Sequence, residues 1–498
     1  MLSKKHKRLI TTNSLFIVFS FAITACDNDS NSSSVDPIEG TWLREGYHQY
    51  IQIDDKTVSI FDYTPNKSAA DHDWCFLTEQ FELDTFNETV NPQISTDKSK
   101  LAFDALELLL DDGGARSYDR IDAMPTACAN GGMLTNEDIG FEGDALDDYK
   151  LFWHAFNVHY PFFELRNIGW SERYNAGLSL ITEHTTPTEL LEIITNSLAD
   201  ISDGHVSTSL DDEYPDIPGS GEEFLALFLN QFNSTGEQGD IEDYIDIRFS
   251  HFITTLREQY LDLSGELEIA GGNIIWGTLT RSGNPQIGFI RLDSFLPEGD
   301  EDNFFDQYTE FLDTIDQIMF ELRNTESMII DVRLNGGGAE TIAFHFANHF
   351  TDEERLVFSK QVYTEEGSSP IVPYSLTPQD DQAAYLKPVR VLVGSYSVSA
   401  AETFPMMMRA LPNVQLVGTR TSGTIATAID KSLPYSGIVL EIPAEIYTTF
   451  DDKIFEEVGV EVDIEVEEFS LQDFDESKDS MLDIAILSLI EDQASMSQ

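Results

Sequence analysis

Three stretches of this chain carry the side chains that acyl transfer requires: a hydroxyl nucleophile, a base and amide donors. Residues 395–404 read Ser-Tyr-Ser-Val-Ser-Ala-Ala-Glu-Thr-Phe and follow the apolar run Val389–Val393, so we expect a buried strand to turn through small residues into a helix. A second apolar run leads into residues 331–338, which end in consecutive glycines, and Asp-Gly-His stands upstream at 203–205. A serine, a glycine loop and an imidazole are the parts of an acyl-enzyme site for amide hydrolysis.

Ordered motifs along the chain resemble those of a known family. The chain is similar to the tail-specific, or C-terminal processing, peptidase family of serine peptidases, which is built on a crotonase-like ββα core. The similarity covers approximately residues 140–470 and implies a peptidase fold and activity. Its motifs are the serine stretch at 395–404, Asp-x-Arg-x-Asn-x-Gly-Gly at 331–338, Val-Gly-Thr-Arg-Thr at 417–421 and Glu-Glu-Val-Gly-Val-Glu-Val-Asp at 456–463.

The resemblance assigns roles to residues around the serine stretch. The family nucleophile matches Ser399 when Glu402 is laid on the family glutamate. A helix N-cap is the structural alternative for Ser399, because serine favours that position, and Ser397 is the rival nucleophile. The backbone amides of Gly337 and Ala400 match the donors of the family's oxyanion hole, where glycine allows close approach of the backbone.

One departure from the family pattern bears on the base. Processing peptidases place a catalytic lysine at the position of Thr424, and Lys431 is out of register. The chain therefore resembles the tricorn-like branch, in which a histidine is the base and a glutamate near the C-terminal Gly-Val segment orients it. Those positions match His205 and Glu456, with Glu457 as the alternative. A serine precedes the histidine in that branch, whereas Gly204 stands here.

The N-terminus has the pattern of a bacterial lipoprotein signal. Basic residues at 4–8 precede an apolar stretch at 15–23, which is short for a bilayer-spanning helix, and small residues follow before Cys26. We expect cleavage before Cys26 and a lipid on its thiol; an ordinary signal peptide with an incidental cysteine is the alternative. Polar residues 27–36 suit a tether. Asp27 after the cysteine is typical of inner-membrane retention in enterobacteria.

The chain is strongly acidic, with a formal net charge of −60. A negative field of this size disfavours nucleic acid and anionic membrane surfaces as partners, and it favours solubility. We interpret the dispersed carboxylates as a solvated face, and selection of basic substrates is the alternative.

The remaining cysteines and a histidine pair are candidates for a disulfide or for metal ligands. Cys75 and Cys128 are expected to form a disulfide in an oxidising compartment, with two free thiols as the alternative. They cannot supply a zinc set at this spacing. His345 and His349 lie four residues apart without the glutamate of a zincin motif, so we interpret them as incidental and predict neither a metal nor a cofactor.

Alternating strand and helix patterns predict an α/β core. Residues 50–53 and 58–61 flank a polar turn and predict a hairpin, and residues 186–189 form a capping box at a helix start. No PDZ carboxylate loop is found after His205. The expected divisions are a signal peptide at 1–25, a lipidated cysteine and tether at 26–37, a small β-rich accessory domain at 38–135, a helical subdomain at 140–210, an insert of helices and strands at 211–285, the peptidase α/β core at 286–470, and a C-terminal helix and tail at 471–498.

These observations predict an exported, membrane-anchored serine peptidase that faces the periplasm and hydrolyses peptides or proteins. A non-catalytic module that holds a peptide or an apolar ligand on the same fold is the alternative. A third hypothesis is an envelope assembly factor in which the N-terminal β-rich domain carries the function. The sequence gives neither the natural substrate nor the oligomeric state.

Overall fold

The computed structural model describes residues 38–496 apart from residues 45, 66–72, 84, 87–91, 104–115, 130–142, 212, 216, 218–221, 271, 280–286, 298–303, 364–368 and 380–382. The expected signal peptide, Cys26 and the tether lie outside the described residues. Within the described part, no helix is long and apolar enough to cross a bilayer.

The N-terminal part of the described chain is a seven-stranded antiparallel sheet in the order β4-β3-β2-β1-β7-β6-β5. The predicted hairpin is present as β2 and β3, with Ile51 opposite Ile60. Cys75 in β4 forms a disulfide with Cys128, and their Cα atoms lie 5.3 Å apart. The strands are β1 (Gly40–Arg44), β2 (Gln49–Ile53), β3 (Thr57–Thr64), β4 (Trp74–Glu82), β5 (Pro92–Ile94), β6 (Lys100–Phe103) and β7 (Arg116–Ile121).

Alternation along these strands explains why the sheet has an apolar layer on each face. Ile51 and Val58 pack with Trp42 in one cluster, whereas Tyr50 and Phe61 pack in another that includes the disulfide. Neighbouring side chains of a strand point to opposite faces, so β2 and β3 each contribute to both clusters.

A helical layer follows, formed by α4 (Ala145–His159), α5 (Trp170–Leu178) and α6 (Pro187–Leu198). The predicted capping box is present at the start of α6, where Thr186 and Glu189 bond to each other's backbone amides. These helices pack on a three-stranded sheet in the order β17-β18-β8 through a shared apolar cluster. Its strands are β8 (Ser207–Ser209), β17 (Ala428–Ser432) and β18 (Val439–Pro443).

The central sheet has seven strands in the order β20-β16-β15-β12-β11-β10-β9. The strands from β11 to β20 pair in parallel, whereas β9 and β10 extend the sheet as an antiparallel pair. The range expected as an insert, 211–285, therefore supplies two strands of this sheet. The strands are β9 (Leu261–Ile269), β10 (Gly272–Leu279), β11 (Ile287–Leu292), β12 (Ser327–Asp331), β15 (Val389–Val393), β16 (Val414–Gly418) and β20 (Ile464–Glu465).

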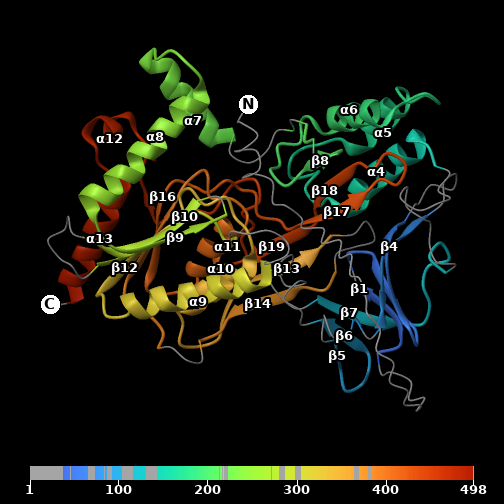
Figure 1. The fold of residues 1–498 in the computed structure, drawn as a ribbon, viewed down its shortest axis with the longest axis horizontal. Helices are drawn as coiled ribbons and strands as arrows, with labels where there is room; N and C mark the ends of the chain where they lie inside the picture. Colours follow the sequence, from blue (N-terminus) through green and yellow to red (C-terminus); the bar gives the residue numbers. More distant parts are fainter. Residues whose placement is uncertain are drawn as a thin grey trace.

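Helices cover both faces of the central sheet (Figure 1). Strand residues such as Ile330 and Val391 pack against α9 (Phe304–Leu322), α10 (Glu340–Asn348) and α11 (Ala400–Met408). Their neighbours Ile329 and Leu392 face α13 (Ser480–Met496) and the π-helical turn η1 (Leu256–Tyr260) on the other side. Burial on both faces is typical of parallel strands and explains their continuous apolar sequences. The remaining helices are α7 (Glu222–Thr235), α8 (Ile241–Thr255) and α12 (Leu471–Glu476).

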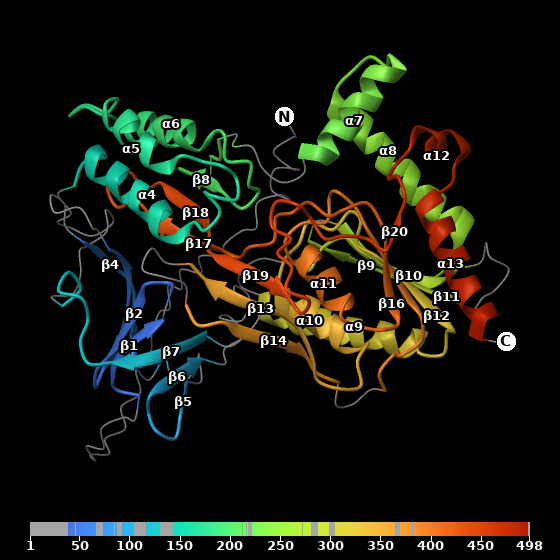
Figure 2. The ribbon, with the colours of Figure 1, turned by 180° about the vertical axis from the view of Figure 1, so that it is seen from behind.

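A further three-stranded sheet, β14-β13-β19, lies between the central body and the N-terminal sheet (Figure 2). It consists of β13 (Arg355–Val362), β14 (Val372–Leu376) and β19 (Glu445–Thr449). The Tyr47 hydroxyl of the N-terminal part donates a hydrogen bond to Glu445 of β19. Residues 438–442 fall inside the range expected as the peptidase core, but they belong mainly to β18 in the sheet that packs under α4 to α6.

Candidate active site

Ser399 lies at a sharp turn between strand β15 and helix α11. Its backbone has φ 57° and ψ −122°, a conformation that residues with a Cβ rarely adopt. The Ser399 amide donates to the carbonyl of Thr424 at 2.9 Å, and its carbonyl accepts from the amides of Glu402 and Thr403 at 2.8 and 3.1 Å. Strained turns of this kind persist where surrounding bonds fix them, and they concentrate at functional sites. The Ser399 side chain is half-buried, and it makes no hydrogen bond that would cap α11.

The glycine loop of residues 336–338 packs directly against this turn. Gly337 has φ 102°, and a Cβ at that position would lie 2.8 Å from the Ser399 Cβ and 2.8 Å from the Val398 carbonyl oxygen. Only glycine therefore fits both the backbone conformation and the space. The Val398 amide donates to the Asn335 carbonyl at 3.3 Å, so the loop and the serine turn are also joined through the backbone.

Polar residues before the glycines hold this loop rather than face a substrate. Buried Arg333 makes paired bonds to Asp331 at 2.9 and 2.7 Å and to Asp479 at 3.0 and 2.7 Å. The Asn335 side chain donates to the Leu292 carbonyl at 3.1 Å. Charge-assisted and bidentate bonds of this kind fix geometry strongly.

The two predicted oxyanion donors differ in their present partners. The Gly337 amide donates to the Asn335 side-chain oxygen at 2.8 Å. The Ala400 amide, in the first turn of α11, has no acceptor among the residues that the structure describes. First-turn amides of a helix lack intrahelical partners and favour negative charge. An anion beside Ser399 could therefore use the Ala400 amide at once, whereas the Gly337 amide would have to be shared with or released from Asn335.

His205 reaches the site from the sheet under the helical layer. It stands two residues before β8, which pairs with β18, and β18 pairs with β17. Its side chain is buried, and burial lowers its pKa below the ordinary histidine value, while Asp203 and a hydrogen bond to the Ala426 backbone act in the opposite direction. The ring nitrogen Nδ1 has no hydrogen-bond partner among the residues that the structure describes.

The segment 424–426 connects the serine turn to the histidine. The Thr424 carbonyl accepts the Ser399 amide, and Ala426 contacts the His205 ring through its backbone. Within the described part of the chain, no hydrogen bond joins Ser399 to His205 directly. Ser399 and His205 thus both contact this short segment, but they do not form the hydrogen bond that a reactive pair would make with each other.

Glu456 is engaged with this same segment and with an arginine. Its carboxylate accepts the amides of Ile425 and Ala426 at 3.1 and 3.0 Å, and it lies 3.3 Å from Arg166. Burial raises its pKa well above the ordinary glutamate value. No hydrogen bond joins Glu456 to His205 among the described residues. Glu457, the alternative, is exposed and bonds through its backbone amide to Gly423 at 2.7 Å.

Asp203 is the carboxylate whose charge acts on the His205 ring. It accepts the His205 backbone amide at 3.1 Å and the Tyr160 hydroxyl at 2.9 Å, and Arg166 lies 3.3 Å from it. Arg166 therefore bridges Asp203 and Glu456. Sequence reasoning named Asp203 only as part of the Asp-Gly-His stretch. It missed Tyr160 and Arg166 as site residues, because no motif marks them.

The rival residues have structural partners. The Ser397 hydroxyl is buried and donates to the Val332 carbonyl at 2.8 Å, so it is not presented at the surface of the turn. Lys431 is buried against the N-terminal sheet, where it pairs with Asp62 of β3. Thr424, at the position of the family lysine, has its hydroxyl 3.3 Å from that of Ser422.

Glu402 fastens the loop after β16 to the first turn of α11. Its fully buried carboxylate accepts the Thr421 hydroxyl at 2.6 Å and the amides of Gly423 and Thr424 at 2.7 Å each. Burial is the main cause that raises the pKa of Glu402 to about 7, and these hydrogen bonds partly oppose it. Because the Thr424 carbonyl in turn accepts the Ser399 amide, Glu402 positions the Ser399 turn indirectly.

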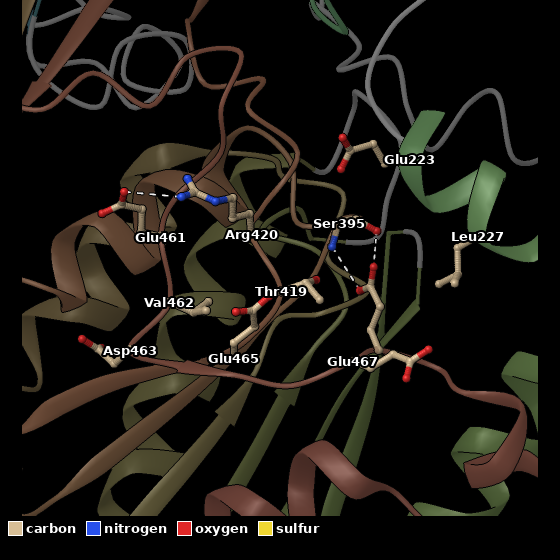
Figure 3. Close-up of a pocket in the computed structure, with 11 residues that line it drawn as sticks. Glu223, Leu227, Ser395, Thr419, Arg420, Glu461, Val462, Asp463, Glu465 and Glu467 are labelled. Carbon is tan, nitrogen blue, oxygen red and sulfur yellow. Dashed lines mark hydrogen bonds and ion pairs between the residues drawn. The ribbon is translucent and has the colours of Figure 1, made fainter.

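A pocket of about 620 Å³ lies near the ends of β15 and β16, and its lining includes neither Ser399 nor His205 (Figure 3). Carboxylates dominate it, including Glu461, which pairs with Arg420 at 3.5 Å. Glu468 accepts the Ser395 amide at 3.1 Å and the Ser395 hydroxyl. This pocket is acidic and distinct from the serine turn.

Comparisons with known proteins find similarity to peptidases. Residues 286–466 match the model of peptidase family S41. The Tricorn protease of Thermoplasma acidophilum is 28% identical over 169 residues, which make up 34% of this chain but only 14% of that protein. A solved protein of Parabacteroides merdae, assigned as a peptidase, has a TM-score of 0.53 at 22% identity over 70% of this chain and 97% of its own. Mature CPAF has a TM-score of 0.51 at 14% identity over 70% of this chain and 98% of its own; at such identities the likeness shows the fold. Residues 286–466, the α/β body that carries Ser399, thus resemble the peptidase domain of family S41.

Proposed function

We propose that the chain is a serine peptidase that hydrolyses peptide bonds in peptides or proteins through an acyl-enzyme. The observation that carries this proposal is the conformation of Ser399. Its strained turn at the start of α11 presents a half-buried hydroxyl beside Gly337 and next to an Ala400 amide without an acceptor among the described residues. A serine that served only as a helix cap would bond to the first-turn amides, and Ser399 does not.

In the proposed mechanism, His205 takes the proton of the Ser399 hydroxyl as the oxygen attacks the scissile carbonyl. The hydrogen bond to the Ala426 backbone, together with the unpartnered Nδ1, favours the tautomer in which Nδ1 holds the lone pair. The amides of Ala400 and Gly337 then stabilise the oxyanion. His205 returns the proton to the leaving amine, and a water repeats the steps on the acyl-enzyme.

Glu456 and Asp203 act behind this pair. Glu456 fixes the segment 425–426 that contacts the His205 ring, and the Asp203 charge favours the imidazolium that forms during proton transfer. Because Ser399 and His205 are not yet hydrogen-bonded, the two must approach further when substrate binds, as is common for catalytic pairs without ligand.

The proposal is tested by digesting a peptide library with purified wild-type protein, Ser399→Ala and Lys431→Ala. We expect cleavage by the wild type and by Lys431→Ala and none by Ser399→Ala. Cleavage that survives in Ser399→Ala, after contaminating peptidases are excluded with a second preparation, contradicts the assignment of the nucleophile.

The lack of a Ser399–His205 bond also suits a second candidate, a module that holds a peptide without cleaving it. Such a module would bind library peptides with equal affinity in the wild type and in Ser399→Ala, and neither protein would yield product. Equilibrium binding measured beside the digest therefore separates the two functions.

The N-terminal pattern supports a further proposal, namely that Cys26 carries a lipid and anchors the chain to an envelope membrane facing the periplasm. The wild type should then fractionate with membranes and require detergent for release. Cys26→Ala should appear in the soluble periplasmic fraction, and an unchanged distribution would contradict the anchor.

A further inference from the structure

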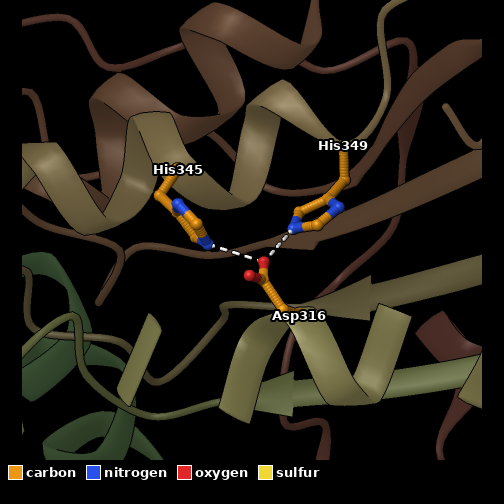
Figure 4. Close-up of side chains that lie close together, drawn as sticks. All are labelled: Asp316, His345 and His349. Carbon is orange, nitrogen blue, oxygen red and sulfur yellow. Dashed lines mark hydrogen bonds and ion pairs between the residues drawn. The ribbon is translucent and has the colours of Figure 1, made fainter. Parts of the chain in front are cut away.

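Two helices on one face of the central sheet bring together a carboxylate and two imidazoles (Figure 4). Asp316 lies on α9, His345 on α10, and His349 directly caps the C-terminus of α10. A spacing of four residues places both histidines on one side of the helix, one turn apart. The sequence alone presented only this pair; the structure adds the third side chain from a separate helix.

The ligand atoms of these side chains converge on one point. Nε2 of His345 lies 2.8 Å and Nε2 of His349 lies 2.9 Å from the same Asp316 oxygen, Oδ1. All three potential ligand atoms lie within 4.8 Å of one another. Among the described residues, no other group of three histidine, cysteine or acidic side chains meets this condition.

The cluster is both held in place and open to solvent on one side. The His349 side chain is only 3% exposed, whereas those of His345 and Asp316 are 20% and 38% exposed. The Gln379 amide lies 3.4 Å from Nδ1 of His345 and 3.2 Å from its carbonyl oxygen, so it supports the edge of the ring that faces away from Asp316. Support of the second ring nitrogen is typical of histidines that bind metals.

We propose that Asp316, His345 and His349 form a binding site for a divalent first-row transition metal, with Zn²⁺ as the best-fitting ion. Two imidazoles and one carboxylate are a ligand set that such ions accept, with a water completing a tetrahedron. Zinc–ligand bonds of about 2.0–2.1 Å place tetrahedral ligand atoms about 3.3 Å apart. The observed spacing requires only a small opening of the cluster, which rotation of the exposed Asp316 side chain can supply.

A metal at this point would tie α9 to α10 near the end of α10. The opposite end of α10 begins at Glu340, two residues after the glycine loop that packs against Ser399. An ion bound here would lie near the end of α10 that is remote from the glycine loop, and it would take no part in the proposed hydrolysis. Its expected role is to fix α10, which is the helix that follows the oxyanion loop, and the proposed metal site does not depend on the peptidase assignment.

The test is a calorimetric Zn²⁺ titration of the purified full chain without a histidine tag, in excess Mg²⁺ to occupy the dispersed surface carboxylates. We expect one equivalent of Zn²⁺ to bind and to raise Tm. His345→Gln and Asp316→Ala should each weaken binding roughly ten-fold or more and remove the Tm shift. The control is His184→Ala, whose exposed ring pairs only with Glu183 and should leave binding unchanged.

Co²⁺ gives an independent readout that does not depend on stability. Bound in the tetrahedral site, it should produce a visible absorption band that Zn²⁺ displaces from the wild type and that is lost in His345→Gln. His345 is partly exposed, so this variant should keep the metal-free Tm of the wild type, which shows that it folds. The proposal is overturned if the wild type binds no stoichiometric Zn²⁺, or if His345→Gln and Asp316→Ala bind it as well as the wild type does.

Discussion

The two halves of the candidate active site are constructed in different ways. The nucleophile half is local: β15 leads into the Ser399 turn and α11 within a few residues, and the glycine loop comes from the adjacent parallel strand β12. The base half is assembled from distant parts of the chain, because His205 depends on a sheet whose partners come from residues 428–443. Arg166, from the loop after α4, bridges the carboxylates of Asp203 and Glu456.

This difference indicates where the site is rigid and where it can adjust. Backbone bonds and close packing fix Ser399 against Gly337 and Thr424. His205 is held by its burial and by the Ala426 backbone, and it has not yet bonded to Ser399. We therefore expect substrate binding to move the base half toward the nucleophile half, and mutations should affect the two halves differently.

The largest expected effect follows from removing either member of the reactive pair. Ser399→Ala and His205→Ala should each lower kcat by roughly a thousand-fold or more, and the double variant should lose little further, because nucleophile and base act as one unit. Steady-state kinetics of the three variants measures this. Additive losses would mean that the two residues do not work together.

The second largest effect on kcat is expected where the glycine loop packs against Ser399. Gly337→Ala forces a Cβ to within 2.8 Å of Ser399 and should lower kcat by roughly 10²–10³-fold, the range for loss of an oxyanion donor. Gly437→Ala is the matched control, since Gly437 also has a positive φ of 74° but no atom within 4 Å of its added Cβ. If both variants lose activity equally, backbone strain rather than contact with Ser399 explains the result.

Substitutions in the base half should mainly lower the stability of the fold. Arg166→Met leaves the buried carboxylates of Asp203 and Glu456 without their shared cation, and should cost about 3–5 kcal/mol in the free energy of unfolding. Glu456→Gln removes one of those charges, so it should lower stability less than Arg166→Met does. It should also lower kcat less than Ser399→Ala or His205→Ala does. Urea unfolding and kinetics on the same preparations test both expectations. Equal loss of kcat in Glu456→Gln and His205→Ala would give Glu456 a direct catalytic role.

The pH dependence of kcat/KM should sharpen the assignment of the base. Burial lowers the pKa of His205, so the neutral imidazole persists below the ordinary histidine value of 6.5, and the acid limb of the profile should fall below that value. Glu402, whose pKa is raised to about 7, must be separated from this limb. A limb that stays below 6.5 in Glu402→Gln belongs to His205, whereas a limb near pH 7 that disappears in Glu402→Gln belongs to the glutamate.

The smallest effect on activity is expected at Lys431. Its ammonium pairs with Asp62 of the N-terminal sheet, so Lys431→Met should leave kcat/KM near that of the wild type and lower only stability. A loss of activity as large as that of His205→Ala, in a variant that remains folded by circular dichroism, would make the lysine the base.

The proximity of Ser399 to the glycine loop could be predicted from the sequence far better than the surroundings of Glu456, for a physical reason. Ser399, Gly337 and the strands before them follow from contiguous patterns of apolar residues and glycines, and the structure places them together. The partners of Glu456 could not be predicted, because Arg166 reaches it from 290 positions away along the chain through tertiary packing alone. The third ligand of the proposed metal site, Asp316, was missed in the same way. Residues 428–443 fall inside the range expected as the peptidase core, but they form β17 and β18 of a separate sheet, since apolar periodicity does not specify a partner.

The central claim, that Ser399 is a nucleophile activated by His205, is tested most directly by labelling with a fluorophosphonate and mapping the adduct by mass spectrometry. We expect a single adduct on Ser399 in the wild type, strongly slowed labelling in His205→Ala, and none in Ser399→Ala. An adduct on Ser397 or Ser395, or a wild type that remains unlabelled while folded, would contradict it.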